Sequence, residues 1–278
     1  MSRIERTAEG AGPFTTRLTW RLSDGGTAVW ESRPARKRGL LTVRAAGEPE
    51  LRSLRADSRS VGRLRRLNAI AAGAFAVGGG LFAAGAAVSQ FGTGALTSAW
   101  IYFSGGLFFN LGGYVSLLQA VNAPRQDGGT GSLAVRRWRW WSYEPERIDW
   151  LSTFLLFVGT LVFGINLLSS LLQGLSVQQM NRLVWAPDVV GCILFLISGH
   201  LALAEICHGR PGIRLHEFGW WIVAVNQLGS VLFMGSALAD FTRPATGSAV
   251  NIDIANWGTL TGALCFSVGG VLQYFERP

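Results

Sequence analysis

The stretch Trp100 to Gln119, WIYFSGGLFFNLGGYVSLLQ, decides the fold because its residue spacing recurs twice further along the chain. Counting from Trp100, Ala186 and Trp257, glycine stands at the fifth place, phenylalanine at the ninth, small residues at the twelfth and thirteenth, and a polar residue at the nineteenth. These places hold Gly105, Gly191 and Gly262; Phe109, Phe195 and Phe266; Gly112, Ser198 and Gly269; Gly113, Gly199 and Gly270; and Gln119, Glu205 and Glu276. Roughly 20 apolar residues in a helix span a bilayer core of ~30 Å, so each copy predicts one transmembrane helix.

A second spacing pairs each copy with the apolar run before it. Gly78, Gly159 and Gly229 each precede a phenylalanine by four residues, and these are Phe82, Phe163 and Phe233. Apolar runs therefore lie at about 67–88, 99–121, 150–172, 186–206, 220–241 and 257–275. Internal repetition of this kind predicts an all-α polytopic membrane protein, with six transmembrane helices arranged as three parallel helical-hairpin repeats.

The predicted domain organisation follows from these runs. A basic N-terminal region covers 1–66, and the hairpin repeats cover 67–121, 150–206 and 220–278. Loops 122–149 and 207–219 connect the hairpins.

Charge predicts the orientation of the chain. Apolar residues make up 49% and charged residues 15%, which is typical of a membrane protein. The N-terminal region, the two connecting loops and the C-terminus hold 23 of the 25 basic residues. By the positive-inside rule both termini and both connecting loops are cytoplasmic, in the inner (plasma) membrane. The net charge of +8 is then explained by anionic lipid headgroups at the cytoplasmic face, with no nucleic-acid partner.

The first 66 residues predict a small sheet followed by a helix. Residues 1–13 lack periodicity and are expected to be disordered. Phe14 to Ser23 alternates in polarity, Asp24-Gly25-Gly26 is a turn signal, and Thr27 to Ser32 returns as a second strand, so a β-hairpin is expected. Residues 39–43 can add a third strand. From Pro49 onward, leucines at helical spacing opposite arginines predict a basic amphipathic helix on the membrane surface.

The loop 122–149 combines a flexible stretch, 126–131, with interleaved tryptophans and arginines, 136–143. Such interleaving can stack nucleic-acid bases. An interfacial aromatic belt with arginines reaching lipid phosphates is the preferred interpretation.

Small residues are the predicted packing sites, because helices in lipid associate through close backbone approach. They are Gly78, Gly105, Gly112, Gly113, Gly159, Ser198, Gly199, Gly229, Gly269 and Gly270.

Polar residues within the spans are few. Asn110, Asn166, Asn226 and Gln227 are expected to bond across helices or to line a hydrated path. Asp149 and Asp188 stand at span starts, where a carboxylate caps a helix.

His200 and Glu205 share one span but lie some 140° apart around the helix, so they do not form a dyad. His200 is expected to bond a neighbouring helix or to face the bundle interior as a proton-sensitive or ligand-binding group, whereas Glu205 is expected to reach the cytoplasmic interface.

Motifs for catalysis or for cofactor binding are absent from the sequence. It has no HExxH, no phosphate loop and no CxxC, and the three cysteines, Cys192, Cys207 and Cys265, have no metal-ligand spacing. We therefore expect no enzyme activity, no cofactor and no metal.

The repeated unit resembles the YrhK-type domain, a small bacterial two-helix membrane unit. The resemblance rests on Gly79-Gly-Leu-Phe82 followed by Trp100-Ile-Tyr-Phe-Ser-Gly-Gly106, on Trp185-Ala-Pro-Asp188 and on the motif that begins at Asn256-Trp257. It covers about 67–278 and looks like the longer actinobacterial members. It implies the topology and no catalytic residues.

Two functional classes remain. The preferred one is a non-enzymatic scaffold, sensor or lipid-interacting membrane protein. The alternative is a small-solute transporter or channel that uses the seam between the pseudo-symmetric repeats. A dry, packed bundle centre would favour the first class and polar cavities the second.

Overall fold

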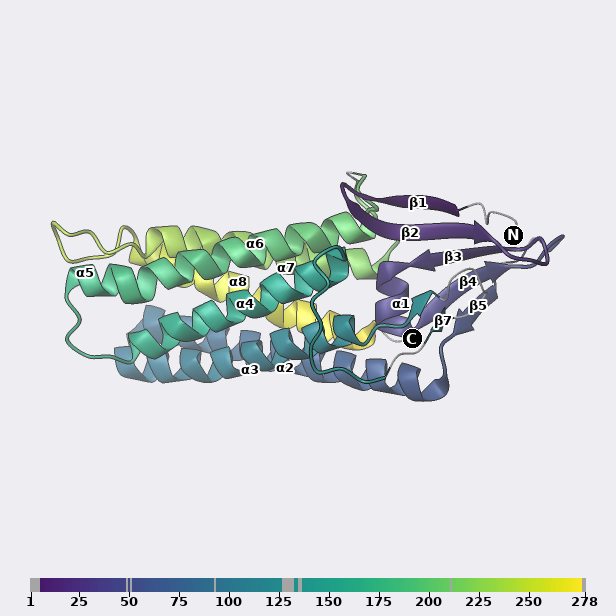
Figure 1. Cartoon of the computed structure of the whole chain (residues 1–278). Coiled ribbons are helices and arrows are strands. Elements are labelled where there is room, and N and C mark those ends of the chain that lie inside the picture. Colours follow the sequence, from purple (N-terminus) through teal and green to yellow (C-terminus); the bar gives the residue numbers. More distant parts are fainter. Residues whose placement is uncertain are drawn as a thin grey trace.

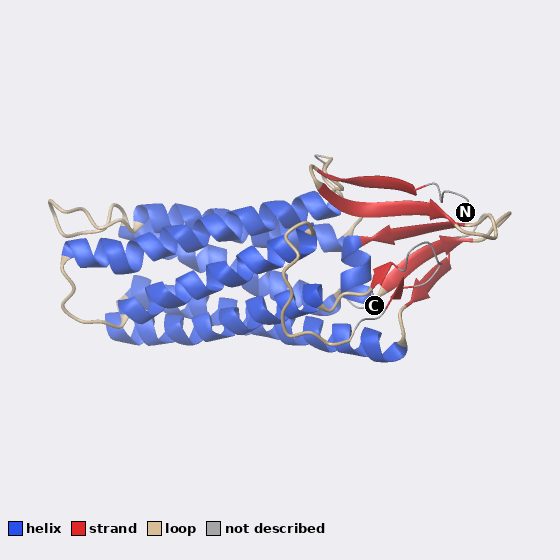
Figure 2. Ribbon diagram, in the orientation of Figure 1, coloured by secondary structure: helices blue, strands red, loops and turns tan. Residues whose placement is uncertain are grey.

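The computed structural model describes residues 6–48, 50, 52–92, 94–126, 133–134, 137–210 and 212–276. The chain is mostly helical, with a sheet at one end of a long helical bundle (Figures 1 and 2). The long helices are α2 (Ser58–Phe91), α3 (Ala95–Val121), α4 (Ile148–Ser170), α6 (Ala186–Ile206), α7 (Phe218–Ala239) and α8 (Ile252–Phe275). Helices thus occupy all six predicted apolar runs. We call the end that carries the sheet the sheet end and the opposite end the far end.

The six long helices form a closed ring. Each packs against the next along the chain, from α2 to α3, α4, α6, α7 and α8, and α8 packs back against α2. Both chain termini lie at the sheet end (Figure 1). The ring therefore has a central axis that runs from the sheet end to the far end.

Among the residues that the structure describes, five helical segments are long and apolar enough to cross a membrane: α2, α3, α4, the continuous segment Val177–Ile206, and α7. The outward-facing positions of the bundle are apolar, with residues such as Leu107, Ile165, Leu228 and Val231 about half exposed. A soluble monomer rarely exposes apolar surface on this scale. The chain is therefore a membrane-embedded protein.

The sheet is larger than the predicted hairpin. Five antiparallel strands pair in chain order, and they are β1 (Arg6–Ala11), β2 (Phe14–Arg21), β3 (Thr27–Glu31), β4 (Leu40–Arg44) and β5 (Arg52–Arg55). A two-stranded ladder, β6 (Arg125–Gln126) with β7 (Leu133–Ala134), lies in the loop after α3. β2 pairs with β3 and β3 pairs with β4, so the predicted hairpin and third strand are confirmed. Trp20, Ala28 and Leu41 form the buried core of the large sheet.

Two predictions for the N-terminal region are wrong. Arg6 to Ala11 is a strand rather than disordered chain, because it pairs with β2 along its whole length. Arg52 to Arg55 is also a strand, since the free edge of β4 pairs with it and Leu41 lies opposite Leu54. The helix begins at Ser58, where the Asp57 side chain accepts from the Ser60 amide.

Some sequence predictions lie outside the described residues. These are the expected disorder of residues 1–5, the expected helix start at Pro49 and Leu51, and most of the flexible stretch 126–131.

Candidate functional site

A short helix that the sequence did not predict organises the sheet end. Helix α1 (Ser32–Arg38) leaves β3 and lies across the end of the ring before the chain enters β4 (Figure 1). It stops at Gly39, whose φ of 61° is left-handed and whose amide bonds Ala35. Glycine adopts that conformation without strain, so the chain can turn sharply back into the sheet.

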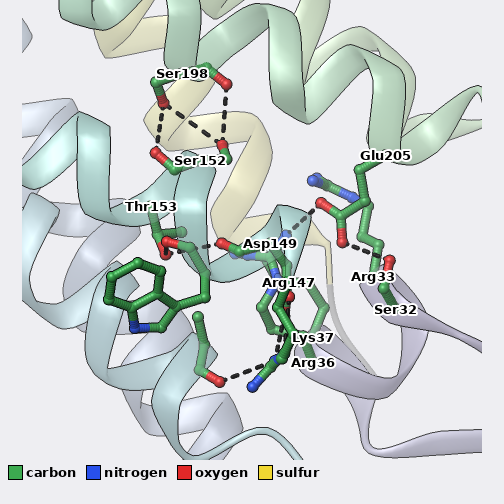
Figure 3. Close-up of polar contacts among 12 residues, drawn as sticks. Ser32, Arg33, Arg36, Lys37, Arg147, Asp149, Ser152, Thr153, Ser198 and Glu205 are labelled. Atoms are coloured by element: carbon green, nitrogen blue, oxygen red, sulfur yellow. Dashed lines mark hydrogen bonds and ion pairs between the residues drawn. The ribbon is translucent and has the colours of Figure 1, made fainter. Parts of the chain in front are cut away.

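Helix α1 binds the second hairpin through a buried carboxylate (Figure 3). Ser32 Oγ donates to Glu205 Oε1 at 2.7 Å, and Arg36 Nη2 donates to Glu205 Oε2 at 2.9 Å. Arg36 also lies 3.7 Å from Asp149. Glu205 is 1% exposed. The prediction that it reaches the interface is wrong, because α1 covers it.

The same helix binds the other two hairpins. Arg33 donates both Nε and Nη2 to the carboxylate of Glu276, at 3.0 and 2.9 Å. Lys37 Nζ donates to Asn68 Oδ1 at 2.8 Å. Asn68 in turn donates to the Gln273 carbonyl at 2.9 Å, which joins α2 to α8.

The three basic side chains meet equivalent places in the three hairpins. Asn68, Asp149 and Gly219 each stand ten residues before the glycine that precedes a phenylalanine by four residues in their hairpin. Lys37 contacts Asn68, and Arg36 lies beside Asp149. A Cβ at Gly219 would lie 2.8 Å from Arg33 Nε. Each hairpin end is thus held by one cation of α1.

Lys37 differs from its neighbours because its partner is an amide. The first hairpin carries Asn68 and Gln119 where the second carries carboxylates. Burial lowers the pKa of Lys37 from 10.5 to about 7, and nearby Arg36 and Arg33 lower it further, while Glu276 and Glu205 oppose the shift. The only lysine in the chain therefore exchanges its proton near neutral pH.

A cavity of about 100 Å³ lies beneath α1, on the axis of the ring. We call it the middle cavity. Arg33, Arg36 and Lys37 line its sheet end, and polar side chains line its wall. The wall residues include Ser116, Ser152, Thr153, Ser198, Asn226, Ser230 and Gln273. A cleft of about 430 Å³ lies on the other side of α1, and it shares Arg33 and Lys37 with the middle cavity.

Six buried phenylalanines close the ring beyond the middle cavity. Phe109, Phe195 and Phe266 form one layer, with ring centroids 5.6–6.5 Å apart. The far-end layer is Phe82, Phe163 and Phe233, and Phe233 lies 6.3 Å from each of the other two. Within each hairpin the two layers touch at 5.0–5.3 Å. We call this arrangement the phenylalanine double layer.

Glycines bring each hairpin's helices close enough to build this layer. A Cβ at Gly78 would lie 2.7 Å from the ring of Phe109, and one at Gly105 would lie 2.8 Å from Phe82. The other two hairpins have the same pair of contacts. In the second, Gly159 faces the ring of Phe195 and Gly191 that of Phe163. In the third, Gly229 faces Phe266 and Gly262 faces Phe233.

The remaining predicted packing residues also lie in close contacts. Cβ atoms at Gly112, Gly113, Gly199, Gly269 and Gly270 would approach neighbouring atoms to between 1.8 and 3.1 Å. Ser198 and Ser152 donate to each other's backbone carbonyl, which joins α6 to α4.

A larger cavity, of about 520 Å³, opens at the far end of the ring. We call it the far-end cavity. Phe82, Phe163 and Phe233 form its floor together with Tyr102, and Asp188 and Asp240 stand in its wall. Amides and hydroxyls complete the wall, among them Ser89, Asn166, Ser170, Ser236, Asn256 and Thr259. The sequence predicts only a helix cap at Asp188, although its position within an apolar run is the signal for this site.

The backbone is irregular beside Asp188. Helix α5 (Val177–Met180) continues into the π-helical turn η1 (Asn181–Trp185) and then into α6. Pro187 has no amide hydrogen, and a π turn is one way for a helix to accommodate such a break. Asn166 donates to the Val184 carbonyl at 2.8 Å and supports the turn from α4. Although Asp188 is in the first turn of α6, it lines the far-end cavity.

The structure separates the other predicted polar residues. Asn226 lines the middle cavity and Asn166 the far-end cavity. Asn110 is half-buried between α3 and α4 and lies 3.4 Å from the Cβ position of Gly164. Gln227 bonds the Leu196 carbonyl across helices.

His200 is exposed on the outer face of α6. The hypothesis that it faces the bundle interior is wrong, because Ser198 and Gly199 occupy the inward-facing part of this turn.

Comparison of the chain with models of known protein families, with curated proteins and with solved structures finds no match. The resemblance to YrhK-type proteins therefore stays an expectation.

Proposed function

We propose that the chain crosses the inner membrane six times, as three hairpins of YrhK-like design about an approximate threefold axis, and that this axis is a gated pathway for a small solute. Transporters commonly place their sites near the membrane midplane between structural repeats, at interrupted helices. The scaffold interpretation calls for a packed, dry centre. The observation that carries our proposal is a series of cavities along the axis, each with polar side chains in its lining and interrupted by two closures.

The order along the axis supports a closed state. From the far end the path leads through the far-end cavity, the phenylalanine double layer and the middle cavity to α1 and the sheet-end cleft. The six rings are between 3% and 8% exposed, so the double layer excludes water. Hydrophobic constrictions gate channels by dewetting. Helix α1 forms the second closure, which ion pairs hold in place.

The sheet end carries the features that we assign to the cytoplasmic face. Trp140, Trp141 and Tyr143 are between 51% and 73% exposed beside the ring, and Arg137 and Arg139 are exposed with them. Aromatic rings at the headgroup level and arginines that reach phosphates are typical of this boundary. We therefore propose anionic headgroups as the partners of this loop.

Solute flux tests the proposal. Purified protein is reconstituted into liposomes, and osmotic swelling is followed by light scattering with urea, glycerol and small ammonium salts. Phe233→Ala opens a gap in the double layer, so it should raise the flux of at least one solute above that of the wild type. Phe91→Ala, at the exposed end of α2, is the matched control and should change nothing.

The variants are compared at equal incorporation and after a monodisperse elution profile. Equal flux for both variants and the wild type, with every solute, would contradict a pathway through the double layer.

A further inference from the structure

The far-end cavity has the chemistry of a specific binding site. Its volume of about 520 Å³ lies within the range of ~300–1,000 Å³ that small-molecule sites occupy. Such a site combines an apolar lining with a few convergent polar groups. This cavity combines aromatic rings at its closed end with two carboxylates in its wall.

The charge of the cavity selects a cation. Asp188 and Asp240 both line it, and among the described lining residues none is Lys, Arg or His. A basic side chain does balance each carboxylate beneath α1, where Arg33 and Arg36 meet Glu276 and Glu205. The far-end carboxylates have no such counter-charge among the lining residues, so a cationic solute would balance them.

The aromatic floor favours an organic cation over a metal ion. Ring faces attract ammonium groups, and aromatic cages bind quaternary ammonium ligands in this way. Phe82, Phe163, Phe233 and Tyr102 supply rings here. A dehydrated inorganic cation instead needs several oxygen ligands at fixed distances. Among the described residues no group of three His, Cys, Asp or Glu side chains could hold a metal.

We propose that the far-end cavity binds a small organic ammonium cation, with Asp188 and Asp240 as its counter-charges and the phenylalanine floor against its apolar part. This names the substrate class of the proposed pathway and rests on that proposal. The π-helical turn at Asn181–Trp185 ends three residues before Asp188, so a change in helix pitch there would move the carboxylate.

Calorimetric titration in detergent tests this site with a matched pair of probes. Choline carries a trimethylammonium group, and 3,3-dimethylbutan-1-ol has the same shape with carbon in place of nitrogen. Choline should bind the wild-type protein, whereas the neutral alcohol should bind at least about tenfold more weakly. Equal affinity for the two probes would overturn the proposal, as would no choline binding.

Variants locate the binding site. Asp188→Asn and Asp240→Asn should each weaken choline binding about tenfold or more. Asp253→Asn removes an exposed carboxylate at the same end of the bundle and should bind like the wild type. If all three variants bound choline equally well, the site would lie elsewhere. The probe comparison needs no variant, so it stays decisive even if a substitution prevents folding.

A potassium control and the swelling assay show which part of the proposal fails, if one does. Potassium chloride at matched ionic strength should neither bind nor displace choline, and displacement by potassium would identify an inorganic cation site. The swelling assay on Phe233→Ala distinguishes the two failures. Increased flux without choline binding contradicts only the ammonium assignment, whereas choline binding without flux contradicts the pathway.

Discussion

Lys37 shows how a single buried residue connects the sheet to the ring. It donates to Asn68, which also accepts a bond from Gln273, so the amide holds both α1 and α8. Lysine is rarely buried without a carboxylate, because desolvation penalises its charged form. Here burial lowers its pKa to about 7.

The pKa of Lys37 predicts how stability depends on pH. Between pH 7 and about 10.5 the unfolded chain holds a proton on Lys37 that the folded protein lacks, so the free energy of unfolding rises with pH across this interval. Lys37→Met should flatten this part of the profile and raise the melting temperature at pH 7, because it removes the cost of burying a charge. The control, Arg44→Met, changes an exposed residue of β4. A slope in Lys37→Met equal to that of the wild type would contradict the account.

The contacts of α1 illustrate what could be predicted from the sequence and what could not. The spacing that places Gln119, Glu205 and Glu276 at helix ends is local, so the polar ends were predictable. The α1 partners of Glu205 and Glu276 lie 169 to 243 residues away along the chain, in a segment without helical periodicity. Pairing over that distance leaves no local signal. The cavities could not be predicted from the sequence either, because they depend on how six helices close into a ring.

At the scale of elements, α1 is held mainly by buried ion pairs. Glu205→Ala should lower the free energy of unfolding by about 3–5 kcal/mol, since Arg36 loses its nearest partner within a buried site. Glu217→Ala is the matched control, because its pair with Arg214 is half-exposed, and it should cost no more than about 1 kcal/mol. Denaturant titration in detergent measures both variants. Similar small losses would mean that α1 is not anchored through Glu205.

Helix contacts at glycine give a second prediction at this scale. A Cβ at Gly270 would lie 2.6 Å from the Ala76 amide nitrogen, where α8 crosses α2, whereas nothing lies within 4 Å of a Cβ at Gly80. Gly270→Ala should therefore cost about 1–3 kcal/mol through overpacking. Gly80→Ala should be neutral or stabilising by up to about 1 kcal/mol, because alanine is the better helix former. Equal effects would show that close approach at Gly270 does not matter.

At the scale of the whole molecule, the closed ring and the six crossings predict which loops share a side of the membrane. Single cysteines introduced at Gln173 and Ala245, both exposed at the far end, should react with an impermeant thiol reagent in intact cells. A cysteine at Glu146, exposed at the sheet end, should react only after permeabilisation. The background replaces Cys192, Cys207 and Cys265. Labelling of Glu146→Cys in intact cells would contradict cytoplasmic termini.

A gated pathway requires that the phenylalanine double layer separates the two cavities on the axis. Ser230 and Ser236 stand on α7 three residues either side of Phe233, and they line the middle cavity and the far-end cavity respectively. The most direct measurement is the rate at which a charged methanethiosulfonate reagent, added on the far-end side of reconstituted protein, modifies a single cysteine at either position.

We predict that Ser236→Cys reacts and Ser230→Cys does not, and that adding Phe233→Ala makes Ser230→Cys reactive from the same side. If Ser230→Cys were as reactive as Ser236→Cys with Phe233 in place, or stayed unreactive without it while Ser236→Cys reacted, the double layer would not be the gate.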